Sequence, residues 1–189
     1  YTYLWSDNQT QDTARNLSAG TYQLTLTDSK GCIDTTSVTI TEPDSLISSI
    51  GSSIDVSCFG GNDAYAVANG VGGTSPYTYL WSDNQVQDTA KNLSARQYRV
   101  TITDALGCSD TVSVEINEPP LLTAVIIDST NISCKDGNDG TATATALGGT
   151  SPYTYSWSNG QSGITATNLL PNTYFVMVTD ANNCSAVAI

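Results

Sequence analysis

The sequence predicts an all-β protein built from tandem copies of one small β-sandwich. Its three tryptophans recur at a spacing of 76 residues, at Trp5, Trp81 and Trp157. Apolar and polar residues alternate with period two in the segments around these tryptophans, which is typical of half-buried strands. A 76-residue period is too long for one rung of a solenoid and suits a small autonomous β domain.

Self-comparison divides the chain into three copies, because residues 1–43 and 77–119 are identical at most positions. We expect residues 1–43 to be the C-terminal part of a truncated repeat, 44–119 a complete repeat and 120–189 a nearly complete one. The chain opens inside a strand-like run and without a methionine, so we interpret it as a window of a longer protein.

The period-two pattern places the strands of the middle copy. We expect strands at 46–50, around Ala66 and Ala68, and at 77–82, 98–103 and 111–116. In the third copy we expect the first strand at 121–127, whereas residues 185–189 are out of phase with the last strand of the middle copy.

Comparison of the copies indicates which face of each strand is buried. The residues at Tyr98, Val100 and Ile102 stay apolar in all three copies, whereas Leu80 is replaced by Ser156 on the outward face. We therefore expect a core centred on the recurring aromatic residues: Trp5, Trp81, Trp157, Tyr22, Tyr98 and Tyr174.

The turns favour an immunoglobulin-like sandwich, similar to PKD and fibronectin type III domains, with seven strands in each repeat. Glycine-rich turns precede the tryptophan strand at 72–76, and an Asp-to-Gly turn at 104–107 is typical of a hairpin. A Leu, a turn and then a Tyr opening a strand resembles the tyrosine corner of such sandwiches, as at 17–22 and 169–174. The Glu118-Pro119 junction is short and stiff.

Charge and composition exclude several function classes. The net charge is −12, with six basic residues, eighteen acidic ones and no histidine. Nucleic acid and anionic membrane surfaces both favour Lys and Arg, so we expect neither as a partner, and no apolar run is long enough for membrane insertion. Without histidine or a glycine loop opening a helix, we expect no enzyme activity, no catalytic residues and no organic cofactor.

The five cysteines allow several pairings. We expect disulfides within each repeat, Cys58 with Cys108 and Cys134 with Cys184, which leaves Cys32 to pair upstream. A second register pairs Cys32 with Cys58 and Cys108 with Cys134; a third joins Cys58 to Cys184 of the next domain, stapling domains end to end; a fourth leaves buried free thiols. The loop and the turn of one simple sandwich lie at opposite ends, beyond the ~7 Å Cα limit for a bridge, so the first pairing requires a separate upward strand at Cys58.

Two loops rich in carboxylate and amide oxygens are candidate Ca²⁺ sites. The ligands would be Asp136, Asn138 and Asp139, and Asn62 and Asp63. An EF-hand is excluded because no bidentate Glu follows at the required distance, and an ordinary Asx turn is the alternative interpretation.

Residues 72–82, 92–95 and 98–108 together resemble the SprB-type repeat of very large cell-surface adhesins of gliding bacteria. The resemblance covers all three copies, with departures at Arg96-Gln97, Asn183 and Ala64, where turn residues differ from the usual pattern. It implies an extracellular location, on the bacterial cell surface or secreted, and a role in adhesion or gliding motility.

Two surface features accompany this resemblance. Asp followed by Ser or Thr looks like the O-glycan acceptor signal of such bacteria, with candidates at Thr13, Thr35, Ser45, Thr89, Thr111 and Ser129. Tyr77, Tyr79 and Trp81 could form a sugar-binding ridge if exposed, but the face pattern favours core packing for them.

We therefore expect a non-catalytic structural segment of a large extracellular adhesin or surface filament. The alternative is a carbohydrate-binding or spacer module of a secreted multidomain enzyme. The expected partners are further repeats of the same long chain, neighbouring copies in a fibre that covers the sheet around Trp5 and Leu17, and an unknown surface or glycan ligand.

Overall fold

The computed structural model describes residues 1–135 and 137–189, and these form fifteen β-strands and no helix. This confirms the predicted all-β class. The chain divides into two compact units, which are Tyr1–Ser45 with Gly72–Thr74, and Leu46–Val71 with Ser75–Ile189.

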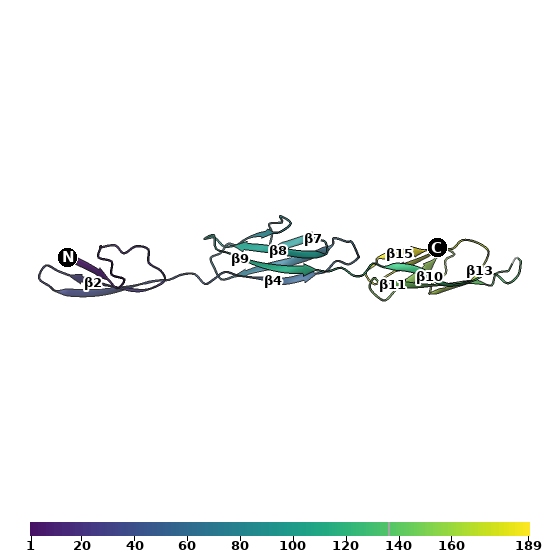
Figure 1. Cartoon of the computed structure of the whole chain (residues 1–189), viewed down its shortest axis with the longest axis horizontal. Helices are drawn as coiled ribbons and strands as arrows, with labels where there is room; N and C mark the ends of the chain where they lie inside the picture. The colour runs from purple at the N-terminus through teal and green to yellow at the C-terminus, as the bar shows by residue number, and fades with distance from the viewer. Residues whose placement is uncertain (136) are drawn as a thin grey trace. The chain divides into compact units, whose positions relative to one another are not determined.

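The first unit contains one antiparallel sheet in the order β1-β2-β3 (Figure 1). Its strands are β1 (Thr2–Trp5), β2 (Gly20–Thr27) and β3 (Ile33–Ile40). Trp5 pairs with Leu24 across the β1–β2 ladder. Trp5, Leu17 and Tyr22 are half-buried in this unit.

The middle repeat is a sandwich of two three-stranded sheets, ordered β4-β5-β7 and β6-β8-β9. The strands are β4 (Ile47–Ile54), β5 (Ala64–Val71), β6 (Thr78–Trp81), β7 (Thr89–Leu93), β8 (Arg96–Thr103) and β9 (Ser109–Ile116). The first and last strands, β4 and β9, contact each other across the two sheets (Figure 1). A register shift between Ile50 and Ser52 marks a bulge at Gly51 in β4.

The third repeat has the same two sheets, ordered β10-β11-β13 and β12-β14-β15. The strands are β10 (Thr123–Thr130), β11 (Gly140–Leu147), β12 (Thr154–Trp157), β13 (Thr165–Leu169), β14 (Val176–Thr179) and β15 (Ser185–Ala188). Val176 pairs with Ala188, which matches the pairing of Val100 with Val112 one repeat earlier. β15 therefore pairs in the same register as β9 of the middle repeat. Its Val187 nevertheless lies on the exposed face of the strand.

The expectation of seven strands in each repeat is wrong, because the described residues form six in each full repeat. The chain between β6 and β7 crosses from one sheet to the other as a tight turn. The backbone N–H of Trp81 donates to the carbonyl of Gln85 at 2.9 Å, and the side chain of Gln85 accepts from the N–H of Lys91 at 2.9 Å. These bonds occupy the segment where a further strand would run.

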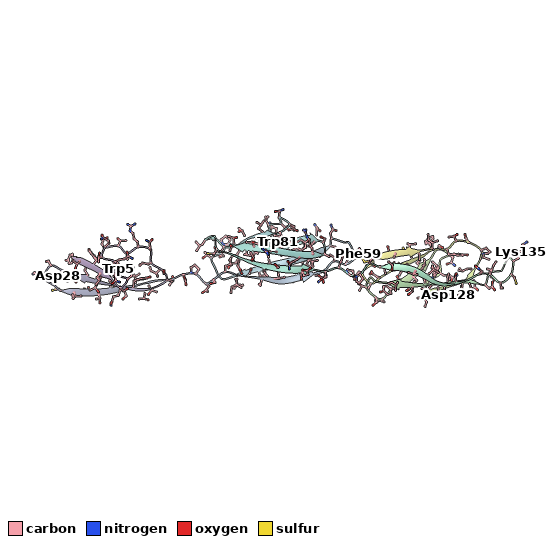
Figure 2. All side chains as sticks on the ribbon, in the orientation of Figure 1. Trp5, Asp28, Phe59, Trp81, Asp128 and Lys135 are labelled. Carbon is pink, nitrogen blue, oxygen red and sulfur yellow. A yellow bond between two sulfur atoms is a disulfide. The ribbon has the colours of Figure 1, made fainter. Side chains whose placement is uncertain are left out.

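The core of the middle repeat forms around the buried indole of Trp81, which is 1% exposed (Figure 2). Val100 and Ile102 from β8 are fully buried with it, and Ala64, Ala66 and Ala68 of β5 belong to the same cluster. Small residues on one sheet leave room for a large ring between the layers. The indole N–H donates to the carbonyl of Gln87 at 2.9 Å, so the buried polar atom is satisfied.

In each full repeat, a tyrosine hydroxyl closes the turn before the central strand of one sheet, β8 or β14. Tyr98 accepts a hydrogen bond from the N–H of Ser94 at 3.1 Å, and Tyr174 accepts one from the N–H of Leu170 at 3.2 Å. A residue with left-handed backbone stands just before the turn, near the end of β7 or β13: Asn92 with φ 55° and Asn168 with φ 54°. The tyrosine corner therefore belongs to the turn that aligns β8 or β14 with the core.

A buried aspartate organises the hairpin turn before the last strand. Asp180, 5% exposed, accepts hydrogen bonds from the N–H groups of Asn182 and Cys184, both at 2.9 Å. Burial alone would raise the pKa of Asp180, but the backbone donors of Thr150, Cys184 and Asn182 outweigh it and hold the pKa below its usual value.

Replacement of the buried indole should destabilise the middle repeat strongly. We expect Trp81→Ala to lower the free energy of unfolding of that repeat by about 3–5 kcal/mol, the usual cost of removing a buried aromatic side chain. Hydrogen exchange of β8 and β9 amides, followed by mass spectrometry, measures the loss. Trp5→Ala is the matched control, because Trp5 has the same sequence neighbours but is only half-buried. Equal losses in the two variants would contradict this account of the core.

The turn carboxylate should make the third repeat sensitive to acid. Since the folded pKa of Asp180 lies below the usual value of 3.8, its stabilisation is complete above that value and is lost as pH falls through the folded pKa. We expect Asp180→Asn to be less stable than the parent at pH 7, with the difference shrinking below about pH 4. Urea unfolding monitored by exchange of β14 and β15 amides at several pH values checks this. A difference that stays constant from pH 7 to pH 2 would argue against it.

Candidate functional site

A disulfide between Cys58 and Cys184 joins the two full repeats within the second unit. Their Cα atoms are 5.8 Å apart, although the residues are separated by 126 positions in the sequence. Cys58 lies in the loop between β4 and β5, which we call the A–B loop, and Cys184 lies in the turn between β14 and β15, which we call the F–G turn.

The expected pairing within each repeat is therefore wrong. Cys58 is bound to Cys184, while Cys108 and Cys134 are free and exposed, as is Cys32, so the second register is also not formed. Val56 donates its N–H to the carbonyl of Asn117, which places the A–B loop beside the end of β9. Cys108 precedes the start of this eight-residue strand. At ~3.3 Å per residue the strand separates the two cysteines by far more than a disulfide can span.

The A–B loop is held in shape by its own serine and aspartate. Asp63 accepts hydrogen bonds from both the N–H and the hydroxyl of Ser57, the first at 3.0 Å. These bonds hold the pKa of Asp63 below its usual value, so the carboxylate stays charged under ordinary conditions. Gly61 closes the loop by donating to the carbonyl of Cys58 at 2.9 Å. The position of Cys58 is thus fixed on both sides.

Three further hydrogen bonds tie this loop to the segment that leads into the third repeat. Val56 donates to the carbonyl of Asn117 at 3.0 Å, Asn117 donates to the carboxylate of Asp55 at 2.9 Å, and Gly60 donates to Glu118 at 2.6 Å. The loop therefore lies at the exit of the middle repeat, where the next repeat begins.

The partner turn contributes one polar contact besides the disulfide. The side-chain amide of Asn182 donates to the carbonyl of Ser57 at 2.8 Å and to the hydroxyl of Thr150 at 3.2 Å. Sequence reasoning missed Asn182, because Leu106 and Lys30 occupy the corresponding positions in the other copies. It also missed the Ser57–Asp63 pair, although Ser133 and Asp139 repeat the same spacing.

Two of the candidate calcium ligands, Asp63 and Asp139, are hydrogen-bonded within their own loops. Asp139 accepts from the N–H of Ser133 at 3.0 Å and from its hydroxyl, as Asp63 does from Ser57. Asn62 and Asn138 are exposed, and Asp136 lies outside the described residues. Among the residues that the structure describes, no group of three or more His, Cys, Asp or Glu side chains is arranged to hold a metal ion.

The candidate glycan acceptors lie mostly at the surface. Thr13, Thr35, Ser45, Thr111 and Ser129 are exposed, whereas Thr89 is half-buried and donates its hydroxyl to Asp88 at 3.0 Å. These positions stay predicted acceptors. The candidate sugar-binding ridge is not exposed as a whole. Trp81 is buried, and Tyr77 and Tyr79 are half-buried against the core.

An open groove of about 500 Å³ lies at one end of the third repeat. It is lined mainly by apolar and neutral side chains, including Ile126, Trp157, Leu169, Tyr174 and Ile189. In the middle repeat, Val56 and Ile116 fill the corresponding end of the core. None of the described residues that line the groove has a charged side chain.

No helix in the described part of the chain has the length and apolar character needed to cross a membrane.

No curated protein sequence matches the chain. Two solved structures are similar over 99% of the chain at a TM-score of 0.31: "Structural basis for Dscam isoform specificity", with 12% identity, and the eight N-terminal Ig domains of Down Syndrome Cell Adhesion Molecule isoform 1.30.30, with 15% identity. The chain corresponds to 63% of the first of these chains and 32% of the second.

The family comparison identifies the repeating unit itself. The model described as the SprB repeat matches residues 51–86 and 126–162. The first match begins in β4 and runs through the A–B loop and Trp81, and the second covers the equivalent part of the third repeat. The chain therefore carries two SprB repeats, one in each of its full sandwiches.

Proposed function

We propose that this chain is a non-catalytic structural segment of a large extracellular adhesin or surface filament that serves adhesion or gliding motility. The observation that carries the proposal is the disulfide from Cys58 to Cys184, which joins one repeat covalently to the next. Disulfides persist in oxidising, extracellular compartments, which supports a location at the cell surface or in the medium.

The position of the disulfide suits a segment under tension. Force enters the middle repeat through β4, whose end leads directly to Cys58, and it leaves the third repeat through β15, which begins next to Cys184. The covalent path from β4 through the bridge to β15 therefore bypasses the rest of both repeats. Their cores, centred on Trp81 and Trp157, are excluded from the extension that a pull on the chain would cause.

The surface of the repeats supports a stalk function better than a carbohydrate-binding one. The aromatic residues of the candidate sugar-binding ridge belong to the core, as the 1% exposure of Trp81 shows. Repetition of one rigid unit along a chain, with a cross-link between units, provides length and strength. We propose that any surface or glycan ligand, and any neighbouring copy in a fibre, contacts residues outside the cores around Trp81 and Trp157.

Single-molecule pulling through the chain ends should show how the disulfide limits extension. Oxidised chains should unfold to a contour length that is shorter by roughly 420–450 Å than Cys58→Ser chains, since a bridge across 126 positions hides that many residues at about 3.3–3.6 Å each. Cys108→Ser is the matched control and should leave the length unchanged, because Cys108 is free.

The biological function is tested with Cys58→Ser in the full-length protein. We expect Cys58→Ser cells to lose attachment or gliding under shear, because the variant removes the bridge. Cells with Ser113→Ala, a change at an exposed position of β9 that leaves every cysteine in place, should keep both. Normal attachment and gliding by cells in which these repeats are deleted would contradict the proposal.

A further inference from the structure

We propose that the Cys58–Cys184 bridge is one rung of a regular ladder, in which the A–B loop of each repeat is disulfide-bonded to the F–G turn of the repeat that follows. In this arrangement the thiol of Cys134 is the site that accepts the F–G cysteine of a following repeat. Cys108 and Cys32 are the F–G cysteines that accept the A–B cysteine of a preceding repeat. The inference rests on the proposed function only in treating the chain as part of a tandem array.

Three contacts of the loop around Cys58 recur in the loop around Cys134. Ser133 donates its N–H to Asp139 at 3.0 Å, as Ser57 does to Asp63. The serine hydroxyl lies 3.9 Å from the neighbouring cysteine sulfur in both loops. Gly137 donates to the carbonyl of Cys134 at 2.9 Å, the same distance as Gly61 to Cys58. The free thiol thus occupies a preformed copy of the bonded site.

The F–G turn of each copy, the hairpin turn that leads into its last strand, has the same hydrogen bonds in all three copies. The N–H of the cysteine donates to the turn aspartate at 2.8 Å for Cys32, and at 2.9 Å for both Cys108 and Cys184. The aspartate N–H returns a bond to the cysteine carbonyl at 2.9 to 3.0 Å in all three turns. Because the backbone around each cysteine is the same, bonded and free sulfurs have the same local geometry.

The ends of the sandwich determine which cysteines can meet. The A–B loop lies beside Asn117 at the exit of its repeat, whereas the F–G turn lies at the other end of β9. A cysteine in one of these positions cannot reach the other in its own repeat. Its equivalent in a neighbouring repeat is within reach, as the 5.8 Å between the Cα atoms of Cys58 and Cys184 shows.

Asn182 is a feature of this junction and not a requirement of the ladder. Leu106 has no side-chain donor to replace the hydrogen bond of Asn182 to the carbonyl of Ser57, and Lys30 occupies the same turn position in the first copy. The hydrogen bonds that position the sulfurs themselves come from aspartates and backbone groups, which all the described turns retain.

Formation of each rung is a two-electron oxidation of two thiols. A thiolate attacks a disulfide oxidant and releases one thiolate from it, which leaves a mixed disulfide on the protein. The second cysteine, as thiolate, then attacks that mixed disulfide, forms the rung and releases the second thiolate of the oxidant. The two protons lost by the cysteine thiols are taken up, through solvent, by the two released thiolates, so the oxidant is recovered as two thiols. Oxidised glutathione is the oxidant used in the experiment.

The test extends the chain by one repeat in the natural register. Residues 114–189 are added again after Ile189, because Ile189 and Ser113 occupy equivalent positions. After refolding with oxidised glutathione, free thiols are alkylated and disulfides are mapped by mass spectrometry. We expect alkylation of the first copy of Cys134, which is complete in the original chain, to fall at least tenfold. Its peptide should be linked to the peptide of the second copy of Cys184.

Two variants and an internal reference make the outcome decisive. Cys134→Ser should leave the second copy of Cys184 as a free thiol, and Cys58→Ser should free the first Cys184 while the new rung still forms. The Cys58–Cys184 bridge in the same molecule reports that the repeats have folded. Persistent alkylation of the first copy of Cys134, or a disulfide between it and the first copy of Cys184, overturns the ladder. This conclusion does not depend on whether the cells adhere. Normal adhesion by Cys58→Ser cells, together with formation of the new rung, would instead count against the proposed function alone.

Discussion

The strand order of the sandwich places the A–B loop and the F–G turn at opposite ends of every repeat, and the other features of the junction depend on that constraint. A cysteine in either position cannot find its partner inside the same sandwich, because an eight-residue strand lies between them. Tandem repetition supplies the partner, since the exit of one repeat faces the entry of the next. The Cys58–Cys184 bridge is the result.

The constraint holds only because each sandwich is a rigid spacer. The buried indole of Trp81 and the alanines of β5 keep the two sheets in register, and the buried Asp180 fixes the turn that carries Cys184. The A–B loop is secured independently by Asp63 and by the contacts of Asn117 and Glu118. Both sulfurs are therefore positioned by local hydrogen bonds before they meet, which limits the entropy lost when the bridge closes.

The sequence was sufficient to predict the repeat, the buried face of the strands and the tyrosine corner, because these depend on local patterns that recur every 76 residues. It was not sufficient for the number of strands, since Gln85 replaces a strand with a hydrogen-bonded turn. Nor did spacing alone decide the disulfide register: Cys58 is closer in sequence to Cys108 than to Cys184, and the end of the sandwich to which each belongs depends on tertiary structure. Asn182 was hidden because only one copy has it.

The length of the covalent loop has a consequence for any array of these repeats. One bridge encloses 126 positions, whereas the repeat advances by 76. Successive loops of a ladder would therefore overlap, so that part of every repeat would be enclosed twice. A pull that broke the packing around Trp81 in one repeat would still find its cysteines held by the neighbours on both sides. Strength in such a chain would come from the covalent register between repeats, while the modest core of each sandwich needs only to keep the sulfurs in place.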